Sequence, residues 1–404
     1  MKNNSSSDTI YVLGAGASIG AKRIPEDHLG SGLKMPSASN SFADIFYSAE
    51  TEHHSERYVN FLGLTYERVN EFLVRAWGMK RNIEAFDIKD WQNINIEDVF
   101  TFLDVGERMF AKGTNYYKAF QQSKSHLEDF IAHMILVRCE GQRCEHLEKV
   151  FRKMNLADTI ITFNWDTLAD TTLDYLQNVQ FENYLKLMSG DSIKISEYKE
   201  AGLLLKLHGS VNWFFCENRK CPDYKKIRLP ITKSLHLPYN PITGSSGKCK
   251  TCKNDLRFFV VPPVSNKEII HQHSYLHKLW LIAREKLAYT YKIVFIGYSF
   301  PSTDFYTEWL FRQINFLVGG KPEITVVNPE VKNRNSQVMK RYKTISRGHK
   351  FQTFNTLKEY GEFVESRGKS LSPTRKGAET APLSERRLPT ATSAKSRSKK
   401  TRWI

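Results

Sequence analysis

Short apolar runs that each end in a polar or glycine-containing motif are the feature that most constrains how this chain folds. Five such runs occur in order, at residues 9–13, 159–163, 203–207, 293–296 and 324–327. Stretches with helical spacing of apolar residues, such as 305–317, separate them. Short apolar strands that alternate with helices favour a mainly parallel, Rossmann-like α/β sheet. Open sheets of this kind bind ligands at the carboxyl ends of their strands.

The region between the first two apolar runs, about residues 50–155, has a different pattern. Its apolar residues recur every three or four positions, and this spacing indicates helices. The clearest examples are Val99, Phe100 and Leu103, and then Leu127 and Ile131. We therefore expect one α/β domain over residues 1–365, with a large helical insertion over about 50–155.

The charge of the chain is concentrated at its C-terminal end. The formal net charge is +16, and residues 366–404 hold eleven Lys or Arg, two Glu and a single aromatic residue. This composition predicts a disordered basic tail. Its net charge of +9 predicts weak contact with nucleic acid, although a purely solubilising tail fits equally well.

The pattern of apolar residues also bears on the compartment. No apolar run reaches the roughly 18 residues that a membrane helix needs, so we expect no membrane partner. The N-terminal residues contain no apolar signal region before the first strand. These features predict a cytoplasmic protein.

The cysteines point to a metal site. Four of the six fall in two close pairs about 27 residues apart, at Cys216, Cys221, Cys249 and Cys252. Four thiolates in two pairs suit a structural, tetrahedral zinc ion. We expect a small zinc-ribbon module over about 212–260, and the alternative is a loop with four free thiols.

The first strand runs directly into a glycine-containing turn. Gly14 and Gly16 can turn tightly and let the backbone approach a phosphate, and Ser18 can cap a helix or bond a phosphate. Ile19 stands where the usual dinucleotide fingerprint has its third glycine. An ordinary turn between a strand and a helix is therefore the alternative at this position.

Motifs at the ends of all five apolar runs occur in a recognisable order. They are GAGAS at 14–18, TFNWD at 162–166, KLHGS at 206–210, GYSFP at 297–301 and VVNPE at 326–330. Together they resemble the sirtuin fold, and specifically the bacterial sirtuin-like proteins that hydrolyse NAD in antiphage defence. The segment INIEDVF at 94–100 is similar to the helical region of those proteins.

The resemblance implies a role for each motif. Asn164 takes the place of the asparagine beside the nicotinamide ribose, and His208 takes the place of the catalytic base. The remaining positions imply NAD-binding residues, namely Gly14, Ala15, Gly16, Ser18, Asp166, Gly297, Ser299 and Asn328. Sirtuins carry a four-cysteine zinc ribbon after the same His-Gly motif. NAD as substrate and a structural zinc ion are therefore the implied cofactors.

Some positions depart from the sirtuin pattern. Phe163 replaces a glutamine, and Trp165 replaces a small aliphatic residue. The segment G-I-P-D-F-R that follows the glycine-rich loop in sirtuins is absent, which puts the groove for acetyl-lysine in doubt. The absence of this segment and the large helical insertion favour an NAD glycohydrolase over an NAD-dependent protein-lysine deacylase.

Other classes of function remain as alternatives. One is a catalytically silent NAD- or ADP-ribose-binding module that assembles with an ATPase or a nuclease, and another is a nucleic-acid-binding protein. The resemblance implies a homo-oligomer, and a separately encoded partner such as a HerA-type ATPase, or a phage trigger, as the activating signal.

Overall fold

The computed structural model describes about two thirds of the chain. The described residues are 8–19, 22–23, 72, 75–78, 94–139, 142–189, 202–224, 226–227, 248–264, 267–301, 303–316 and 321–369. The helical pattern predicted from residue 50 to 93 lies outside this part except for a few positions, and so does the tail from residue 370 onward.

A six-stranded sheet forms the centre of the molecule, and its strand order is β10-β9-β8-β1-β4-β5. All of its neighbouring strands pair in parallel. The strands are β1 (Thr9–Leu13), β4 (Thr159–Thr162), β5 (Leu204–Lys206), β8 (Lys292–Ile296), β9 (Glu323–Val327) and β10 (Phe351–Phe354). Most of their side chains are buried, as both faces of a parallel sheet require. The predicted α/β class with a mainly parallel sheet is confirmed.

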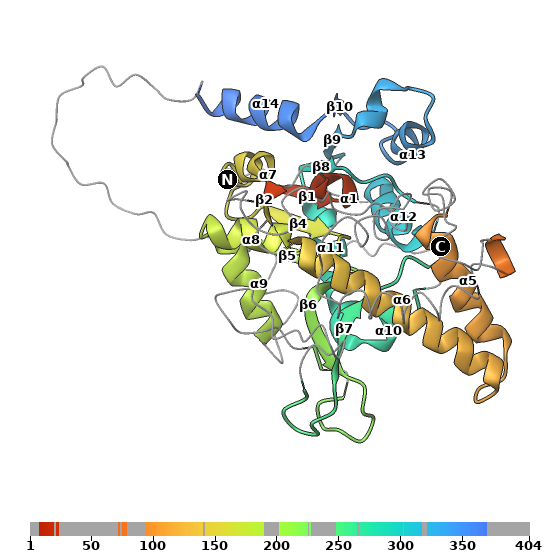
Figure 1. Ribbon diagram of the computed structural model, residues 1–404. Coiled ribbons are helices and arrows are strands. Elements are labelled where there is room, and N and C mark those ends of the chain that lie inside the picture. Colours follow the sequence, from red (N-terminus) through yellow and green to blue (C-terminus); the bar gives the residue numbers. More distant parts are fainter. Residues whose placement is uncertain are drawn as a thin grey trace, which may run out of the picture.

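Helices surround the sheet, and a hairpin extends from one end of it (Figure 1). Short elements also occur: α1 (Ala15–Ser18), the pair β2 (Lys22–Arg23) and β3 (Gln142–Arg143), and the 3-10 turns η3 (Gln313–Phe316) and η4 (Pro329–Lys332). The helices that follow β4 along the chain are α8 (Leu168–Tyr175), α9 (Val179–Ser189), α10 (Ile269–Gln272), α11 (Ser274–Tyr289), α12 (Phe305–Arg312), α13 (Gln337–Ile345) and α14 (Leu357–Lys369). Helix α14 packs against α7 (Glu145–Phe151) and continues to Lys369, four residues into the segment predicted as a tail.

The described part of the helical insertion contains α5 (Ile96–Met109) and α6 (Asn115–Cys139), which pack against each other. Helix α5 begins where the Asn95 side chain accepts a hydrogen bond from the Glu97 backbone N–H, at 2.9 Å. The apolar residues of its buried face are Ile96, Val99, Phe100 and Leu103, as the sequence pattern predicted, and Glu97 and Asp104 are buried with them.

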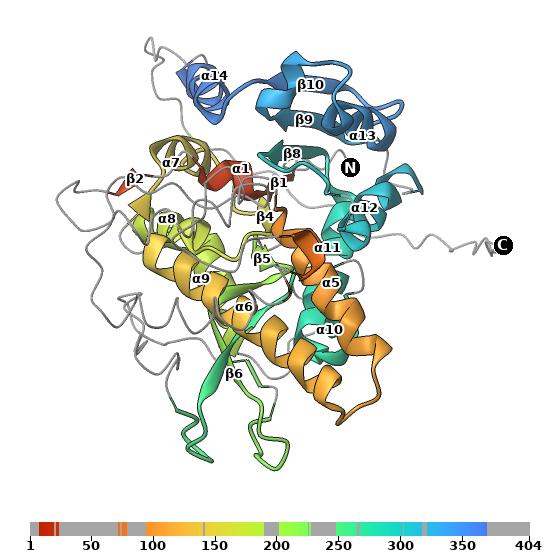
Figure 2. The same ribbon diagram turned by 45° about the vertical axis from the view of Figure 1, so that its right-hand side comes forward.

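The insertion has a hydrophobic core of its own. This second core joins α5 and α6 to a hairpin formed by β6 (Gly209–Cys216) and β7 (Leu256–Val260). Figure 2 shows the two long helices lying beside this hairpin. Trp165 belongs to the same core, because its ring contacts Phe100 at 6.4 Å between centroids and its indole N–H donates to the Val261 carbonyl at 3.2 Å. The tryptophan that departs from the sirtuin pattern thus anchors the insertion to the sheet.

No helix in the described ranges is both long enough and apolar enough to cross a membrane.

Candidate functional site

Two glycine-containing loops meet at the carboxyl end of β1 and β8. Gly16 N–H donates to the Gly297 carbonyl at 2.9 Å, and Gly14 N–H donates to the Ile296 carbonyl at 3.0 Å. A Cβ on Gly16 would lie 2.8 Å from Gly297 Cα, and a Cβ on Gly14 would lie 2.6 Å from Tyr298 Cα. The absence of a side chain at both glycines lets the two loops touch, and Gly16 stays exposed, so its contact with a phosphate stays a prediction.

The loop at 297–301 is held in an unusual backbone conformation. Gly297 has a φ of +62°, and Phe300 has a φ of +52°, which is rare for a bulky residue. The Tyr298 carbonyl accepts hydrogen bonds from the Tyr342 hydroxyl at 2.5 Å and from the Asn328 side-chain amide at 3.3 Å. Asn328 is buried and also caps η4, so its side chain braces this loop.

Asn164, Ser18 and Asp166 form one hydrogen-bonded chain below the first loop. The amide nitrogen of Asn164 donates to the Gly14 carbonyl at 2.9 Å and to Ser18 Oγ at 3.0 Å. Ser18 Oγ in turn donates to Asp166 at 2.6 Å. Asp166 also accepts from the Leu168 N–H at 3.0 Å, near the start of α8. The structure thus brings three predicted site residues together, with Ser18 and Asp166 buried and paired to each other.

A buried ion pair supports the Asn164–Asp166 turn from beneath. The Lys206 ammonium lies 2.7 Å from an Asp170 oxygen, and both side chains have no exposed surface. The same ammonium donates to the Asp166 carbonyl at 2.6 Å. The position of the turn therefore depends on the first residue of the KLHGS motif, for which no role was predicted from the sequence.

His208 lies in an apolar environment after β5. It is 7% exposed, and its ring contacts Phe163 at 5.0 Å and Trp280 at 6.3 Å between centroids. Burial, together with the nearby Lys267, lowers the pKa of His208 to about 3, although Asp304 and a hydrogen bond with the Phe163 backbone oppose this shift. His208 is therefore neutral at pH 7, and its Nε2 has no hydrogen-bond partner among the described residues.

Three further buried polar groups lie close to His208, and none of them had a role predicted from the sequence. Asp304 Oδ2 lies 3.7 Å from His208 Nε2 and accepts from the Tyr298 hydroxyl at 2.7 Å. Asp304 Oδ1 lies 3.5 Å from the ammonium of Lys267, which is 1% exposed. Burial raises the pKa of Asp304, but its interactions with His208 and Lys267 and the hydrogen bonds from Tyr298 and Thr307 outweigh burial and lower it to about 2.

The helical insertion also contributes to this cluster. Glu97 of α5 is buried and accepts a hydrogen bond from the Thr303 hydroxyl at 2.6 Å, one residue before Asp304. Burial raises the pKa of Glu97, while Thr303 and Lys267 oppose the shift. Glu97 belongs to the INIEDVF segment, which resembles the helical region of the sirtuin-like proteins. This segment therefore reaches the site through the Glu97 side chain.

The predicted site residues differ in their access to solvent. Ala15, Gly16 and Ser299 are exposed, Gly297 and Asn164 are half-buried, and His208 lies deeper. The arrangement therefore combines an open rim, formed by the two loops, with a buried and unprotonated ring nitrogen, His208 Nε2.

The four predicted zinc ligands come together at the far end of the β6–β7 hairpin. Their sulfur atoms all lie within 4.8 Å of one another, and Cys216–Cys252 and Cys221–Cys249 are 3.5 and 3.8 Å apart. Tetrahedral zinc with Zn–S bonds of about 2.3 Å separates its sulfurs by about 3.8 Å, so the donor set fits this metal. Backbone hydrogen bonds lower the pKa of Cys249 and Cys252, whereas burial raises the pKa of Cys216 and Cys221.

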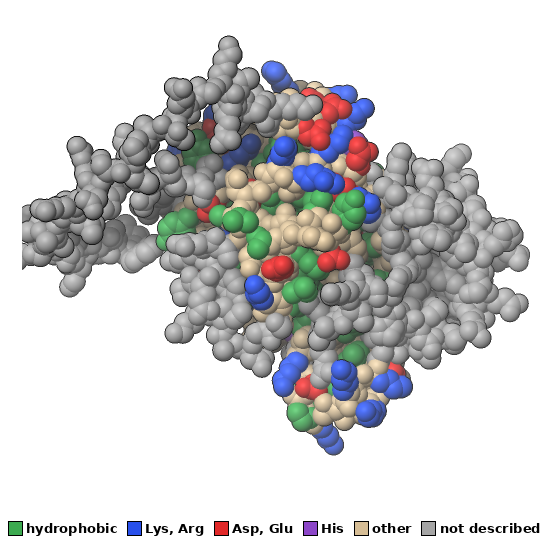
Figure 3. Space-filling model, turned by 90° about the vertical axis from the view of Figure 1, so that its left-hand side faces the viewer, with side chains coloured by type: hydrophobic (Ala, Val, Ile, Leu, Met, Phe, Trp, Pro, Cys, Tyr) green, Lys and Arg blue, Asp and Glu red, His purple; other side chains and the backbone are tan. Residues whose placement is uncertain are grey.

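Basic side chains gather around this end of the hairpin, at the bottom of the view in Figure 3. The exposed cations there are Arg219, Lys220, Lys226, Lys248, Lys250 and Lys253. Lys226 and Lys248 pair with Asp223 and Asp255, at 3.5 and 3.1 Å.

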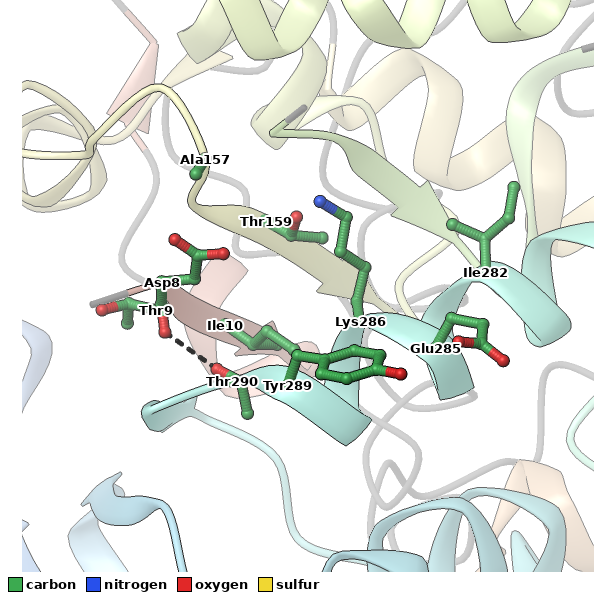
Figure 4. Close-up of a pocket in the computed structure, with 10 residues that line it drawn as sticks. All are labelled: Asp8, Thr9, Ile10, Ala157, Thr159, Ile282, Glu285, Lys286, Tyr289 and Thr290. Carbon is green, nitrogen blue, oxygen red and sulfur yellow. Dashed lines mark hydrogen bonds between the residues drawn. The ribbon is translucent and has the colours of Figure 1, made fainter. Parts of the chain in front are cut away.

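A hollow in the described surface lies at the opposite edge of the sheet (Figure 4). Thr9 and Thr159, the first residues of β1 and β4, line it together with the C-terminal part of α11. Lys286 of α11 extends across the hollow toward Thr159. Because the predicted motifs follow the last residues of the strands, this hollow is separate from the site around His208.

Several solved structures are similar to this chain. One of them is a crystal structure of Sir2 in complex with the inhibitor EX-527, 2'-O-acetyl-ADP-ribose and a deacetylated p53 peptide. The match covers 91% of this chain and 96% of the Sir2 chain, with 15% sequence identity and a TM-score of 0.32. No family model matches the chain, and no curated protein matches it.

Proposed function

We propose that the protein hydrolyses NAD to nicotinamide and ADP-ribose, with Asn164 and His208 as its catalytic residues. The observation that carries the proposal is the His208 side chain, which is buried and neutral and has an unpartnered Nε2 among the described residues. It lies at the carboxyl edge of a parallel sheet, where such folds bind nucleotides. The five sequence motifs in sirtuin order support NAD as that nucleotide.

The chemistry needs only modest help from the protein. A water oxygen forms a bond to the ribose C1' atom, while the bond from C1' to the nicotinamide nitrogen breaks. The electron pair of that bond neutralises the nicotinamide, which leaves as an uncharged molecule. The water proton passes to His208 Nε2, which can accept it because the imidazole is neutral at pH 7.

Asn164 contributes through its side-chain oxygen. Its amide nitrogen is already held by Gly14 and Ser18, so the amide plane is fixed. Within the described ranges the oxygen accepts no hydrogen bond, and it can therefore orient the water or a ribose hydroxyl. Positioning of this kind lowers the barrier by fixing the reacting atoms before the reaction.

Access to His208 requires a change from the structure described. The ring is covered by Phe163, Trp280 and Tyr298, whose aromatic rings contact it or one another. We therefore propose a resting state that an activating signal opens. A role in antiphage defence by NAD depletion, a homo-oligomer, and activation by a HerA-type ATPase or a phage trigger rest on the sequence resemblance alone.

The test measures release of nicotinamide and ADP-ribose from NAD, with and without an acetylated peptide. Asn164→Ala and His208→Ala should each lower turnover by about 100- to 10,000-fold, the usual contribution of a positioned acid or base. His271→Ala, which removes an exposed histidine on α10, is the matched control and should keep wild-type turnover.

Three outcomes would contradict the proposal. Equal turnover in the wild type and both variants would remove Asn164 and His208 from the catalytic site. Cleavage that depends on the acetylated peptide would make the protein a deacylase. Failure of the wild-type chain to bind NAD would refute the NAD site itself, whereas failure to cleave it is expected of a resting state that no activating signal has opened.

A further inference from the structure

A fully buried lysine beside the candidate base is the feature that the proposed function leaves unexplained. Lys267 precedes α10, is 1% exposed, and lies in no motif that the sequence singled out. Burying an ammonium group is costly, so a buried lysine needs a compensating partner. Its partner is Asp304, at 3.5 Å.

The same Asp304 carboxylate also faces His208. One oxygen approaches Lys267, and the other lies 3.7 Å from His208 Nε2. A buried carboxylate at this distance from an imidazole normally draws a proton onto the ring. An imidazolium cannot accept a proton from water, so the pull of Asp304 narrows the pH range over which His208 can act as a base.

The other charged or titratable groups around this pair are few. The Tyr298 hydroxyl donates to the Asp304 oxygen that faces His208. Glu97 reaches the cluster from α5 and interacts electrostatically with both Lys267 and Asp304. Lys267 is therefore the cation that balances Asp304, and its charge also repels a proton from His208.

We propose that Lys267 is a positioning residue that pairs with Asp304 and so offsets the pull of that carboxylate on a proton at His208, which widens the pH range over which the ring is uncharged. The proposal rests on the proposed function, because it concerns the base of that reaction. It assigns a task to Lys267 and Asp304 that is electrostatic and does not require either side chain to touch NAD.

The test follows the protonation of His208 directly, by NMR of histidine-labelled full-length protein without NAD. The His208 signal is assigned by its loss in His208→Gln. In Lys267→Gln the amide can still donate to Asp304, but the positive charge is gone. The titration midpoint of His208 should then rise by about 1 to 3 pH units, the effect expected of one nearby charge.

Two further variants separate electrostatics from packing. Lys267→Arg keeps the charge and should keep the wild-type midpoint. The double variant Lys267→Gln/Asp304→Asn removes both charges and should return the midpoint toward that of the wild type. If Lys267→Gln does not fold, Lys267→Met replaces it, because its side chain fills a similar volume without a polar group.

The pH dependence of NAD cleavage gives a second readout. The acidic limb of the rate profile should move to higher pH in Lys267→Gln and should move back in the double variant. Lys118→Met, which removes an exposed lysine on α6, is the control and should leave the profile unchanged.

An unchanged midpoint in Lys267→Gln would overturn the proposal, and so would a double variant whose midpoint is as high as that of the single variant. The NMR midpoints are measured without NAD. They therefore decide the role of Lys267 even if the chain does not bind NAD, a result that would refute only the proposed function.

Discussion

The contact between the two glycine loops can be tested by adding one methyl group. Gly297 has a φ of +62°, and a Cβ there would lie 2.2 Å from Ala17 N and 2.3 Å from Gly16 C. An L-residue in the left-handed region costs about 1–2 kcal/mol. Forcing a methyl group into packed backbone costs about 1–3 kcal/mol more. We therefore expect Gly297→Ala to lower the free energy of unfolding by about 2–5 kcal/mol.

Two matched variants separate these contributions. Gly113 has a φ of +90° and nothing within 4 Å of its added Cβ, so Gly113→Ala should cost only the backbone part, about 1–2 kcal/mol. Gly16 lacks a positive φ but would contact Gly297 Cα at 2.8 Å, so Gly16→Ala should cost only the steric part. Urea unfolding followed by tryptophan fluorescence measures all three. If Gly297→Ala costs no more than Gly113→Ala, the two loops are not in contact and the site as described is wrong.

Four other predictions follow from buried charges, the cysteine cluster and the tail. Lys206→Met leaves Asp170 as an uncompensated buried charge and should cost about 3–5 kcal/mol in urea unfolding, whereas removal of both charges should cost less. His208 has a pKa of about 3 in the folded protein and 6.5 as its ordinary value, so only the unfolded chain binds its proton between these values. Stability should fall by about 1.4 kcal/mol for each pH unit of acidification through this window, and His208→Gln should remove that part of the slope. Metal analysis should find one zinc ion per chain, and Cys249→Ser should lower both the zinc content and the melting temperature; zinc-free wild-type protein would contradict this. Truncation after Lys369 keeps α14 intact and should preserve NAD cleavage while it weakens low-salt retention of DNA; equal retention would assign no binding role to the tail.

The sequence was sufficient to predict the central sheet, because its strands are short, buried runs between helices. Five of the six strands match predicted runs to within a residue or two. The missed strand, β10, has only four residues, and two of them are exposed, so it gives no continuous apolar signal. The cluster of four cysteines was also predictable, because two closely spaced cysteine pairs are typical of a tetrahedral zinc site.

The motifs likewise identified which strand ends carry polar groups, and the parallel sheet brings those ends to one edge. The sequence could not show how the groups pair. It predicted that Gly14 and Gly16 contact a phosphate, and the structure adds that both permit contact with the second loop. It predicted that Asp166 contacts the ligand, and the structure adds a hydrogen bond from Ser18 to Asp166.

The charge state of His208 was decided by tertiary structure alone. Asp304 resembles an ordinary helix cap in the sequence, and it does accept a hydrogen bond at the start of α12. Lys267 lies in none of the sequence motifs. Glu97 lies on the mainly apolar buried face of α5, some 110 residues before His208. Motifs record neighbours along the chain, but a pKa depends on burial and on charges brought close in space. Those distances exist only once the insertion, the β5 end and the loop before α12 have packed together.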